Sequence, residues 1–322
     1  MRVPKSRGPL SEHVVQSIAS PVHRVAGHPE IGVPSLTDDD LHLALYLCYE
    51  LHYTALDGVD PAWEWEPSLL EFRRAMEDAF EKELTVTVPA AASEGDIAST
   101  LAVLAERDSG CSLGRYLEKN PSIERFREFV QHRSAYQLKE ADPHSWVIPR
   151  LGGKAKAALI EIQSDEYGGG QAEAMHAILF RDTMRALGLD DSYGGYVDRL
   201  PGVTLAGVNV MSLFGLHRRW RGAIVGHLAL FEMTSTEPNR RYGNALRKLG
   251  FGRDATHFYD EHVEADAVHE AIAAHDLAGS LAQEEPHIAS DIVFGARCLQ
   301  YLDELWCNHV IEAWEHGRSS LL

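Results

Sequence analysis

Apolar residues recur at helical spacing along most of the chain, and the two-residue alternation of a half-buried strand is nearly absent. Only "LTVTVP", near residue 85, has a strand-like pattern. Amphipathic segments, many with acidic residues or proline at the start and glycine or proline after the end, occupy residues 35–58, 67–84, 94–108, 120–144, 152–189, 217–235, 237–250, 254–283 and 288–317. The sequence therefore predicts an all-α protein.

The overall composition limits the classes of partner. Hydrophobic residues make up 45% and charged residues 24% of the 322 residues, which is typical of a globular protein with a sizeable core. A formal net charge of −18 repels phosphate backbones and argues against nucleic-acid binding. No apolar run approaches the roughly 20 residues that span a bilayer, and the basic N-terminus has no apolar stretch behind it of the kind a secretory signal needs. We expect no membrane association.

The four cysteines are scattered and form no CxxC pair; they are Cys48, Cys111, Cys298 and Cys307. This pattern fits a reducing cytoplasm and argues against both a disulfide framework and a structural zinc site. We therefore expect a cytoplasmic protein.

The segment "DEHVEADAVHE", residues 260–270, contains the most informative spacing. Each helical residue turns about 100°, so His262, Asp266 and His269 fall within an arc of roughly 60° and face the same way. His257 lies about 140° away from His262 and is expected to point elsewhere. With 17 histidines in the chain, such a pattern also arises by chance, and a solvated acidic helix face stays an alternative to a metal site.

Two further segments place carboxylates and a histidine in apolar helical surroundings. "SDEYGGGQAEAMHAILF" contains Glu166, Glu173 and His176, and Glu232 follows the apolar run "GAIVGHLALF". A carboxylate in such surroundings is costly unless it is paired, protonated or bound to a cation. Helical bundles that hold two irons use carboxylates and histidines from several helices in this way, and iron accepts mixed imidazole and carboxylate ligands.

In their order and spacing, the segments "EIQSDEYGGGQAEAMHAILF", "FEMTS" and "HVEADAVH" resemble the heme-oxygenase-like di-iron oxidases and oxygenases, the iron-containing redox enzyme family. The resemblance runs from about residue 40 to the end. It implies a heme-oxygenase-like helical bundle with an N-terminal helical extension. We expect an irregular arm over residues 1–40, a helical region packing on the bundle over 41–110, and the di-iron domain over 111–322.

The family's ligand pattern, carried over residue by residue, implies metal ligands that would also form the catalytic centre: Glu166, His176, Glu232, His262, Asp266 and His269. Some members have a further carboxylate ligand, and Glu140 in "QLKEADPH" stands where it is expected. Ideal helix geometry brings Glu173 at least as near His176 as Glu166. Because the glycine run can break the helix, Glu166 is preferred, and Glu173 is expected just outside the ligand set.

A basic cluster follows the Glu232 segment. If the substrate carries a carboxylate, Arg240, Arg241 or Tyr242 is positioned to bind it, and a guanidinium binds carboxylates bidentately. Salt bridges to the many acidic residues are the competing interpretation.

The resemblance implies a non-heme di-iron oxidoreductase with two Fe(II) ions per chain and O2 as co-substrate. We expect it to oxidise a small amino-acid-like or aliphatic molecule in specialised, natural-product metabolism, by C–H abstraction leading to desaturation, C–C cleavage or ring closure. N-oxygenation of an amino-acid-derived amine is the second alternative. A heme-binding or cofactorless member of the same fold, and a non-catalytic helical interaction protein with a degenerate site, are the others. A homodimer and an external electron donor stay open.

Overall fold

The structure is a computed structural model that describes residues 1–32, 35–54, 56–88, 96–107 and 110–322, with the side chains of residues 266 and 267 left out. Within these ranges all regular elements are helices and no strand occurs, which confirms the all-α prediction. The strand-like "LTVTVP" lies mostly in a helix instead. Leu84 and Val88, four residues apart, are buried, whereas Val86 between them is 70% exposed, so alternate residues do not share one buried face. In the same ranges, no helix is both long and apolar enough to cross a bilayer.

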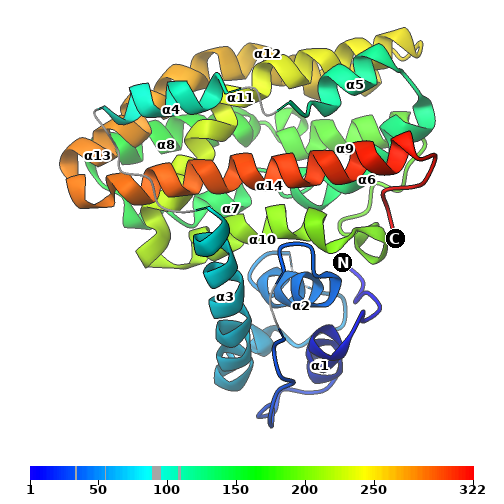
Figure 1. Cartoon of the computed structure of the whole chain (residues 1–322), viewed down its shortest axis with the longest axis vertical. Coiled ribbons are helices and arrows are strands. Elements are labelled where there is room, and N and C mark those ends of the chain that lie inside the picture. Colours follow the sequence, from blue (N-terminus) through cyan, green and yellow to red (C-terminus); the bar gives the residue numbers. More distant parts are fainter. Residues whose placement is uncertain (33–34, 55, 89–95, 108–109) are drawn as a thin grey trace.

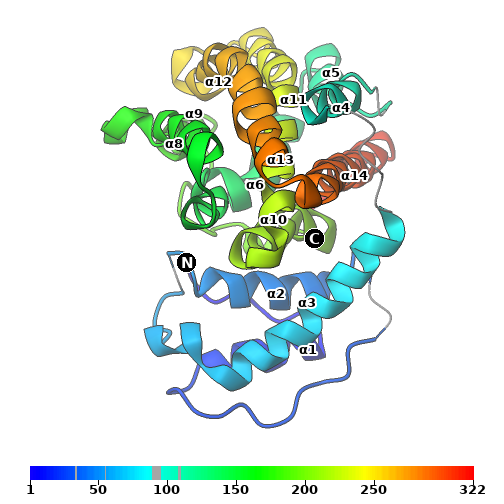
Figure 2. The same cartoon turned by 90° about the vertical axis from the view of Figure 1, so that its left-hand side faces the viewer.

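Three N-terminal helices form a layer below the rest of the molecule (Figures 1 and 2). They are α1 (Pro9–Ile18), α2 (Asp39–Glu50) and α3 (Pro67–Thr87). Helix α2 packs between α1 and α10 (Gly202–Leu216). The expectation of an irregular arm over residues 1–40 is therefore wrong at α1. That helix starts at a proline and buries an apolar face with Leu10, Val14 and Ile18.

The remaining helices form the bundle above this layer (Figure 1). They are α4 (Ile97–Ala105), α5 (Leu113–Lys119), α6 (Ile123–Gln137), α7 (Asp142–Ser145), α8 (Gly153–Glu166), α9 (His176–Ala186), α10, α11 (Arg221–Lys248), α12 (Arg253–Ala271), α13 (Ser280–Glu284) and α14 (Ala289–Glu315). Helix α11 packs against both α12 and α14, and α4 packs on α11 and α14 rather than with the N-terminal helices. A π-helical segment, Ile272–Gly279, joins α12 to α13.

Two glycines permit the close crossing of α11 and α14. A Cβ at Gly226 would overlap the backbone of Ile292, and a Cβ at Gly295 would overlap the backbone of Ala223. Because backbones approach this closely only where side chains are absent, the crossing fixes α11, which carries Glu232, relative to the bundle.

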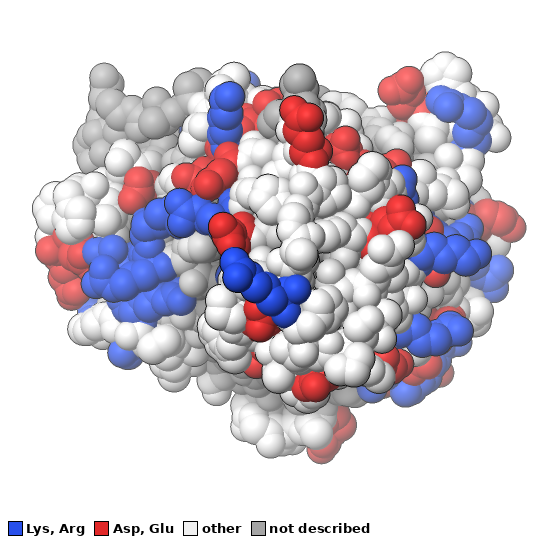
Figure 3. All heavy atoms as spheres, turned by 90° about the horizontal axis from the view of Figure 1, so that it is seen from below, with Lys and Arg blue, Asp and Glu red and all other residues white. Residues whose placement is uncertain are grey.

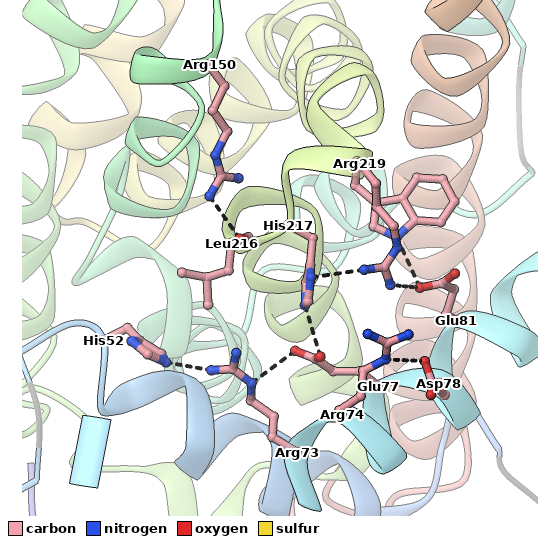
Figure 4. A network of polar contacts seen from close by, with 11 residues as sticks. His52, Arg73, Arg74, Glu77, Asp78, Glu81, Arg150, Leu216, His217 and Arg219 are labelled. Carbon is pink, nitrogen blue, oxygen red and sulfur yellow. Dashed lines mark hydrogen bonds and ion pairs between the residues drawn. The ribbon is translucent and has the colours of Figure 1, made fainter. Parts of the chain in front are cut away.

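A polar network attaches the N-terminal layer to the bundle (Figure 4). Buried Glu77 of α3 accepts a hydrogen bond from His217 Nε2 at 2.9 Å and pairs with Arg73 Nε at 3.2 Å. Arg219, in the turn before α11, pairs with Glu81 of α3. On the described face of the molecule seen from below, basic and acidic side chains surround a largely uncharged area (Figure 3).

Two of the cysteines differ from the sequence expectation. Cys111 and Cys307 form a disulfide across a sequence separation of 196 residues, linking the segment before α5 to α14. Cys48 and Cys298 are buried and free. The expectation against disulfides is therefore wrong for this pair, because spacing along the chain does not reveal which cysteines the fold brings together. The cysteine-based argument for a reducing cytoplasm is lost with it.

Candidate metal centre

Glu140 lies in the turn between α6 and α7. The next residue, Ala141, has φ of 72°, and its carbonyl oxygen accepts a hydrogen bond from Gln163 Nε2 at 2.9 Å. A left-handed backbone at a residue other than glycine costs free energy, so surrounding contacts must hold it. Gln137 Nε2 donates to Glu140 Oε1 at 3.2 Å. The turn thus directs a buried carboxylate inward from the end of α6.

Glu166 and His176 meet across a break between two helices. Glu166 is the last residue of α8 and His176 the first of α9. Gly168, Gly169 and Gly170 between them all have positive φ, which glycine adopts without a steric penalty. His176 Nδ1 consequently lies 2.9 Å from Glu166 Oε2. Glu173 is exposed in the connecting turn, so the structure brings Glu166 to the site and leaves Glu173 in solvent.

Helices α11 and α12 supply the remaining described donors. His262 Nδ1 lies 2.8 Å from the carbonyl oxygen of Phe258, so this nitrogen donates, and Nε2 faces Glu140 Oε1 at 3.5 Å. A hydrogen bond of this kind fixes the tautomer of a metal-binding imidazole. His269 Nδ1 lies 3.2 Å from Glu232 Oε2. The side chain of Asp266 lies outside the described part of the chain.

These side chains form two groups that share one member. Glu140, Glu166, His176 and His262 offer one set of ligand atoms, and Glu166, Glu232 and His269 offer another, each with its atoms within 4.8 Å of one another. All of these residues are buried. Glu166 belongs to both groups. The structure thus brings together every described member of the predicted ligand set.

The electrostatics of the two groups favour a cation. Burial raises the pKa of the Glu140 carboxyl, with His262 opposing and Glu166 adding to the shift. Burial likewise raises the pKa of Glu232, against the hydrogen bond from His269. For His269 burial alone would lower the pKa, but Glu232 and Asp165 outweigh it and raise the pKa to about 9. Several buried carboxylates so close together require protons or cations for stability.

The donor set fits iron. Carboxylate oxygens and imidazole nitrogens are ligands that iron accepts together, and the set contains no thiolate that would select a softer metal. Buried carboxylates and histidines from several helices are the kind of donors with which helical bundles build metal sites in their cores.

Two side chains at this site escaped the sequence analysis. Asp165 Oδ2 lies 3.1 Å from His269 Nε2 and contacts the nitrogen that faces away from Glu232. Tyr136 is buried, and burial followed by the charges of Glu140, Glu166 and Glu232 raises its pKa well above the ordinary value. No pattern in the sequence marks either residue as part of the site. Asp165 adjoins Glu166 in sequence, and Tyr136 reaches the site from one helical turn before Glu140.

The predicted substrate-binding cluster is divided. Arg240 pairs with Glu237 at 2.7 Å, and Arg241 pairs with Glu237 at 2.6 Å and Glu118 at 3.3 Å. Neither arginine lines the cavity next to the metal centre, so the competing salt-bridge interpretation describes both. Tyr242 is buried and does line that cavity. The cavity has a volume of about 510 Å³ and reaches His262.

The fold and this site define a protein of the iron-dependent redox class. The chain matches the sequence profile described as iron-containing redox enzyme over residues 127–304, more than half of its length, and it belongs to that family. The predicted family and the heme-oxygenase-like fold are thereby confirmed.

One known protein is similar to part of the chain in sequence, and a solved structure is similar to it in fold. The chain is 25% identical to a nitrosourea synthase from Streptomyces achromogenes subsp. streptozoticus over 146 residues, which are 45% of this chain and 31% of that protein. The match therefore spans about a third of the relative's length. A CADD-like protein of unknown function from Nostoc punctiforme shares the fold, with a TM-score of 0.50 at 14% identity, covering 74% of this chain and 98% of that one.

Proposed function

We propose that the chain is a non-heme di-iron oxidase that activates O2 to oxidise a small amino-acid-like or aliphatic molecule in specialised metabolism. The observation that carries the proposal is the pair of buried donor groups that share Glu166. The family supports an iron-dependent oxidoreductase, and the number of irons and the reaction are the parts proposed here.

The donors divide between two positions. Glu140, His176 and His262 would hold one ion, Glu232 and His269 the other, and Glu166 would contact both. Asp266, one turn after His262, is proposed as a further ligand from its position on α12. Two ferrous ions held there would supply two electrons to dioxygen.

Other parts of the protein would hold a proton near the metal centre and give the substrate a route to it. Tyr136, whose raised pKa keeps its hydroxyl protonated, stands beside three carboxylates and can hold a proton at the site. The cavity that reaches His262 brings substrate to one side of the centre. We place C–H abstraction first, leading to desaturation, C–C cleavage or ring closure.

N-oxygenation of an amine is the second candidate reaction. It is favoured by the similarity to a protein named nitrosourea synthase, although that similarity covers less than half of this chain. Both reactions use the same donor set, so the product distinguishes them. An external electron donor, a homodimer and a cytoplasmic location are proposed as well.

Anaerobic loading with Fe(II), followed by exposure to oxygen and mass spectrometry of a panel of amino acids and amines, tests the proposal. We expect about two irons per chain and loss of two hydrogens, cleavage, or gain of oxygen in a substrate. Saturation at one equivalent, or preference for zinc without oxygen uptake, would contradict a di-iron oxidase. That outcome would favour the non-catalytic alternative.

A further inference from the structure

Charged side chains of both signs line the cavity beside His262: Arg107, Arg115 and Arg133, together with Glu106, Asp303 and Glu304. Glu106, Arg107 and Arg115 are exposed, whereas Arg133 and Asp303 are partly buried and the charge of Arg133 acts on Asp303. Arg133 comes from α6 and Asp303 from α14, and both line the cavity of about 510 Å³. Arg133 stands about two helical turns before Glu140, on the helix that leads to this metal ligand. The cavity that Arg133 and Asp303 line also reaches the proposed metal ligand His262.

Aromatic rings hold the guanidinium of Arg133 in place. Its central carbon lies 4.8 Å from the ring centre of Trp306 and 6.0 Å from that of Phe129. Such stacking uses the face of the guanidinium, and one of its N–H groups interacts with the hydroxyl of Tyr242. The other N–H groups on its edge can bind a carboxylate. The arginine is thus oriented before a ligand arrives.

Asp303 is a partly buried carboxylate in the wall of the cavity. Burial raises its pKa, and Arg133 opposes the shift. Yet the two side chains form no ion pair within 4.0 Å. Two opposite charges that influence each other without touching leave room for a ligand with complementary charges between or beside them.

Polar atoms of three neighbouring side chains lack hydrogen-bond partners in the described structure. They are Trp306 Nε1, Tyr259 Oη and Gln137 Oε1, on side chains that line the same cavity and have exposed fractions of 7%, 2% and 7%. Buried polar atoms are normally satisfied, so these atoms are available to water or to a polar ligand in the cavity. Gln137 also donates to Glu140, which connects the cavity to the metal centre.

We infer that Arg133 and Asp303 bind the two charged ends of a zwitterionic α-amino acid, with Arg133 taking its carboxylate and Asp303 its ammonium group. The inference rests on the proposed function, and within it selects amino acids over uncharged aliphatic molecules. Trp306 Nε1 adds a donor for the carboxylate, and Gln137 Oε1 adds an acceptor for the ammonium group. The remaining aromatic wall surrounds the ligand's side chain.

Calorimetric titration of the iron-loaded protein under anaerobic conditions, with the twenty common L-amino acids as probes, tests this assignment without chemistry. For the amino acid that binds most tightly, we would titrate the matching amine, which lacks the carboxylate, and the matching acid, which lacks the amine. Each truncated probe should bind about 10- to 100-fold more weakly, because one charge-assisted contact is lost. Equal binding of either truncated probe, or no binding by any amino acid, would overturn the inference.

Substitutions at Arg133 and Asp303 test which charged end of the amino acid each residue binds. Arg133→Gln should weaken the amino acid about 10- to 100-fold and the amine little, whereas Asp303→Asn should weaken the amino acid and leave the acid nearly unchanged. Arg185→Gln and Asp182→Asn are matched controls, since these residues form an exposed pair on α9 at 2.9 Å. If both cavity variants weaken all three probes equally, or neither weakens the amino acid, the assignment of ends is wrong.

Iron content measured on the same samples separates this inference from the proposed function. Protein that binds two irons and consumes oxygen but binds no amino acid would overturn the zwitterion site alone. Amino-acid binding with the predicted dependence on Arg133 and Asp303, in protein that fails to load iron, would overturn the di-iron proposal alone.

Discussion

Glu166 Oε2 lies 2.9 Å from His176 Nδ1 although a broken helix separates the two residues. An unbroken helix would place Glu173, not Glu166, near the face of His176. The left-handed glycines at 168–170 end α8 and return the chain so that α9 begins at the histidine. The local backbone therefore decides which glutamate reaches the metal centre.

Replacing each glutamate tests that relationship. Glu166→Ala removes the carboxylate shared by both donor groups, so we expect bound iron to fall from about two equivalents to less than one. Glu173→Ala changes an exposed side chain and should leave iron content unchanged. Metal analysis of the purified, reconstituted variants provides the measurement, and the reverse ranking would reassign the ligand.

Helix α12 carries both proposed metal ligands and residues that are not ligands, so variants of the two kinds can be compared. His262→Ala and His269→Ala each remove a buried imidazole next to a carboxylate, and both should lose iron and oxygen uptake together. His257→Ala and Glu264→Ala alter exposed or half-exposed positions on the same helix, with expected effects on stability within about 0.5 kcal/mol. Equal tolerance at His262 and His257 would support the solvated acidic face.

Asp165 is expected to orient His269 rather than to bind metal itself. Asp165→Ala should weaken iron binding about tenfold, since removal of a carboxylate that orients a ligand histidine typically has this effect. Asp165→Asn keeps an oxygen acceptor and should recover part of the affinity. Glu161→Ala, exposed on the same helix, is the control. A loss as large as that of His269→Ala would instead make Asp165 a ligand.

The sequence predicted those features that depend on local periodicity. The helical spacing of His262 and His269 placed both on one buried face, and the apolar run before Glu232 indicated its burial. Features that depend on contacts between distant segments were missed. Arg133 and Asp303 lie on separate helices, and nothing in either segment specifies that they share a cavity.

Backbone conformation was a second feature that could not be predicted from the sequence. The choice between Glu166 and Glu173 depends on positive φ at three glycines, which the sequence permits without requiring. The N-terminal segment shows the same limit, because its prolines and glycines indicated an irregular arm while Pro9 starts a helix. Proline is compatible with both a loop and a first helical turn.

Reduction of the Cys111–Cys307 bond should destabilise the fold. Opening a cross-link over 196 residues of chain typically costs about 2–4 kcal/mol, by restoring freedom to the unfolded state. Thiol titration of the denatured protein should find two free cysteines before reduction and four after it. Cys307→Ser should match the reduced wild type in denaturant unfolding and should not respond to reductant; four thiols at the outset would show that the bond does not form.

The Glu77 network between α3 and the bundle predicts a pH dependence of stability (Figure 4). Burial raises the pKa of Glu77, but the hydrogen bond from His217 and the charge of Arg73 outweigh it and hold the pKa below the ordinary value of 4.5. The folded state consequently binds fewer protons than the unfolded state. This contribution to stability is fully present above about pH 4.5 and is lost as the pH falls towards the lowered pKa.

Glu77→Gln should therefore lower the free energy of unfolding at neutral pH by about 3 kcal/mol, because Arg73 and His217 lose a buried anionic partner. It should also flatten the decline of stability below pH 4.5, since the titrating group is gone. Asp78→Asn is the matched control on the same helix: its pair with Arg74 is exposed, so a change below about 1 kcal/mol is expected. Urea unfolding from pH 7 to pH 3 measures both effects. Equal pH profiles for wild type and Glu77→Gln would show that protonation of this carboxylate does not control the attachment of the N-terminal layer.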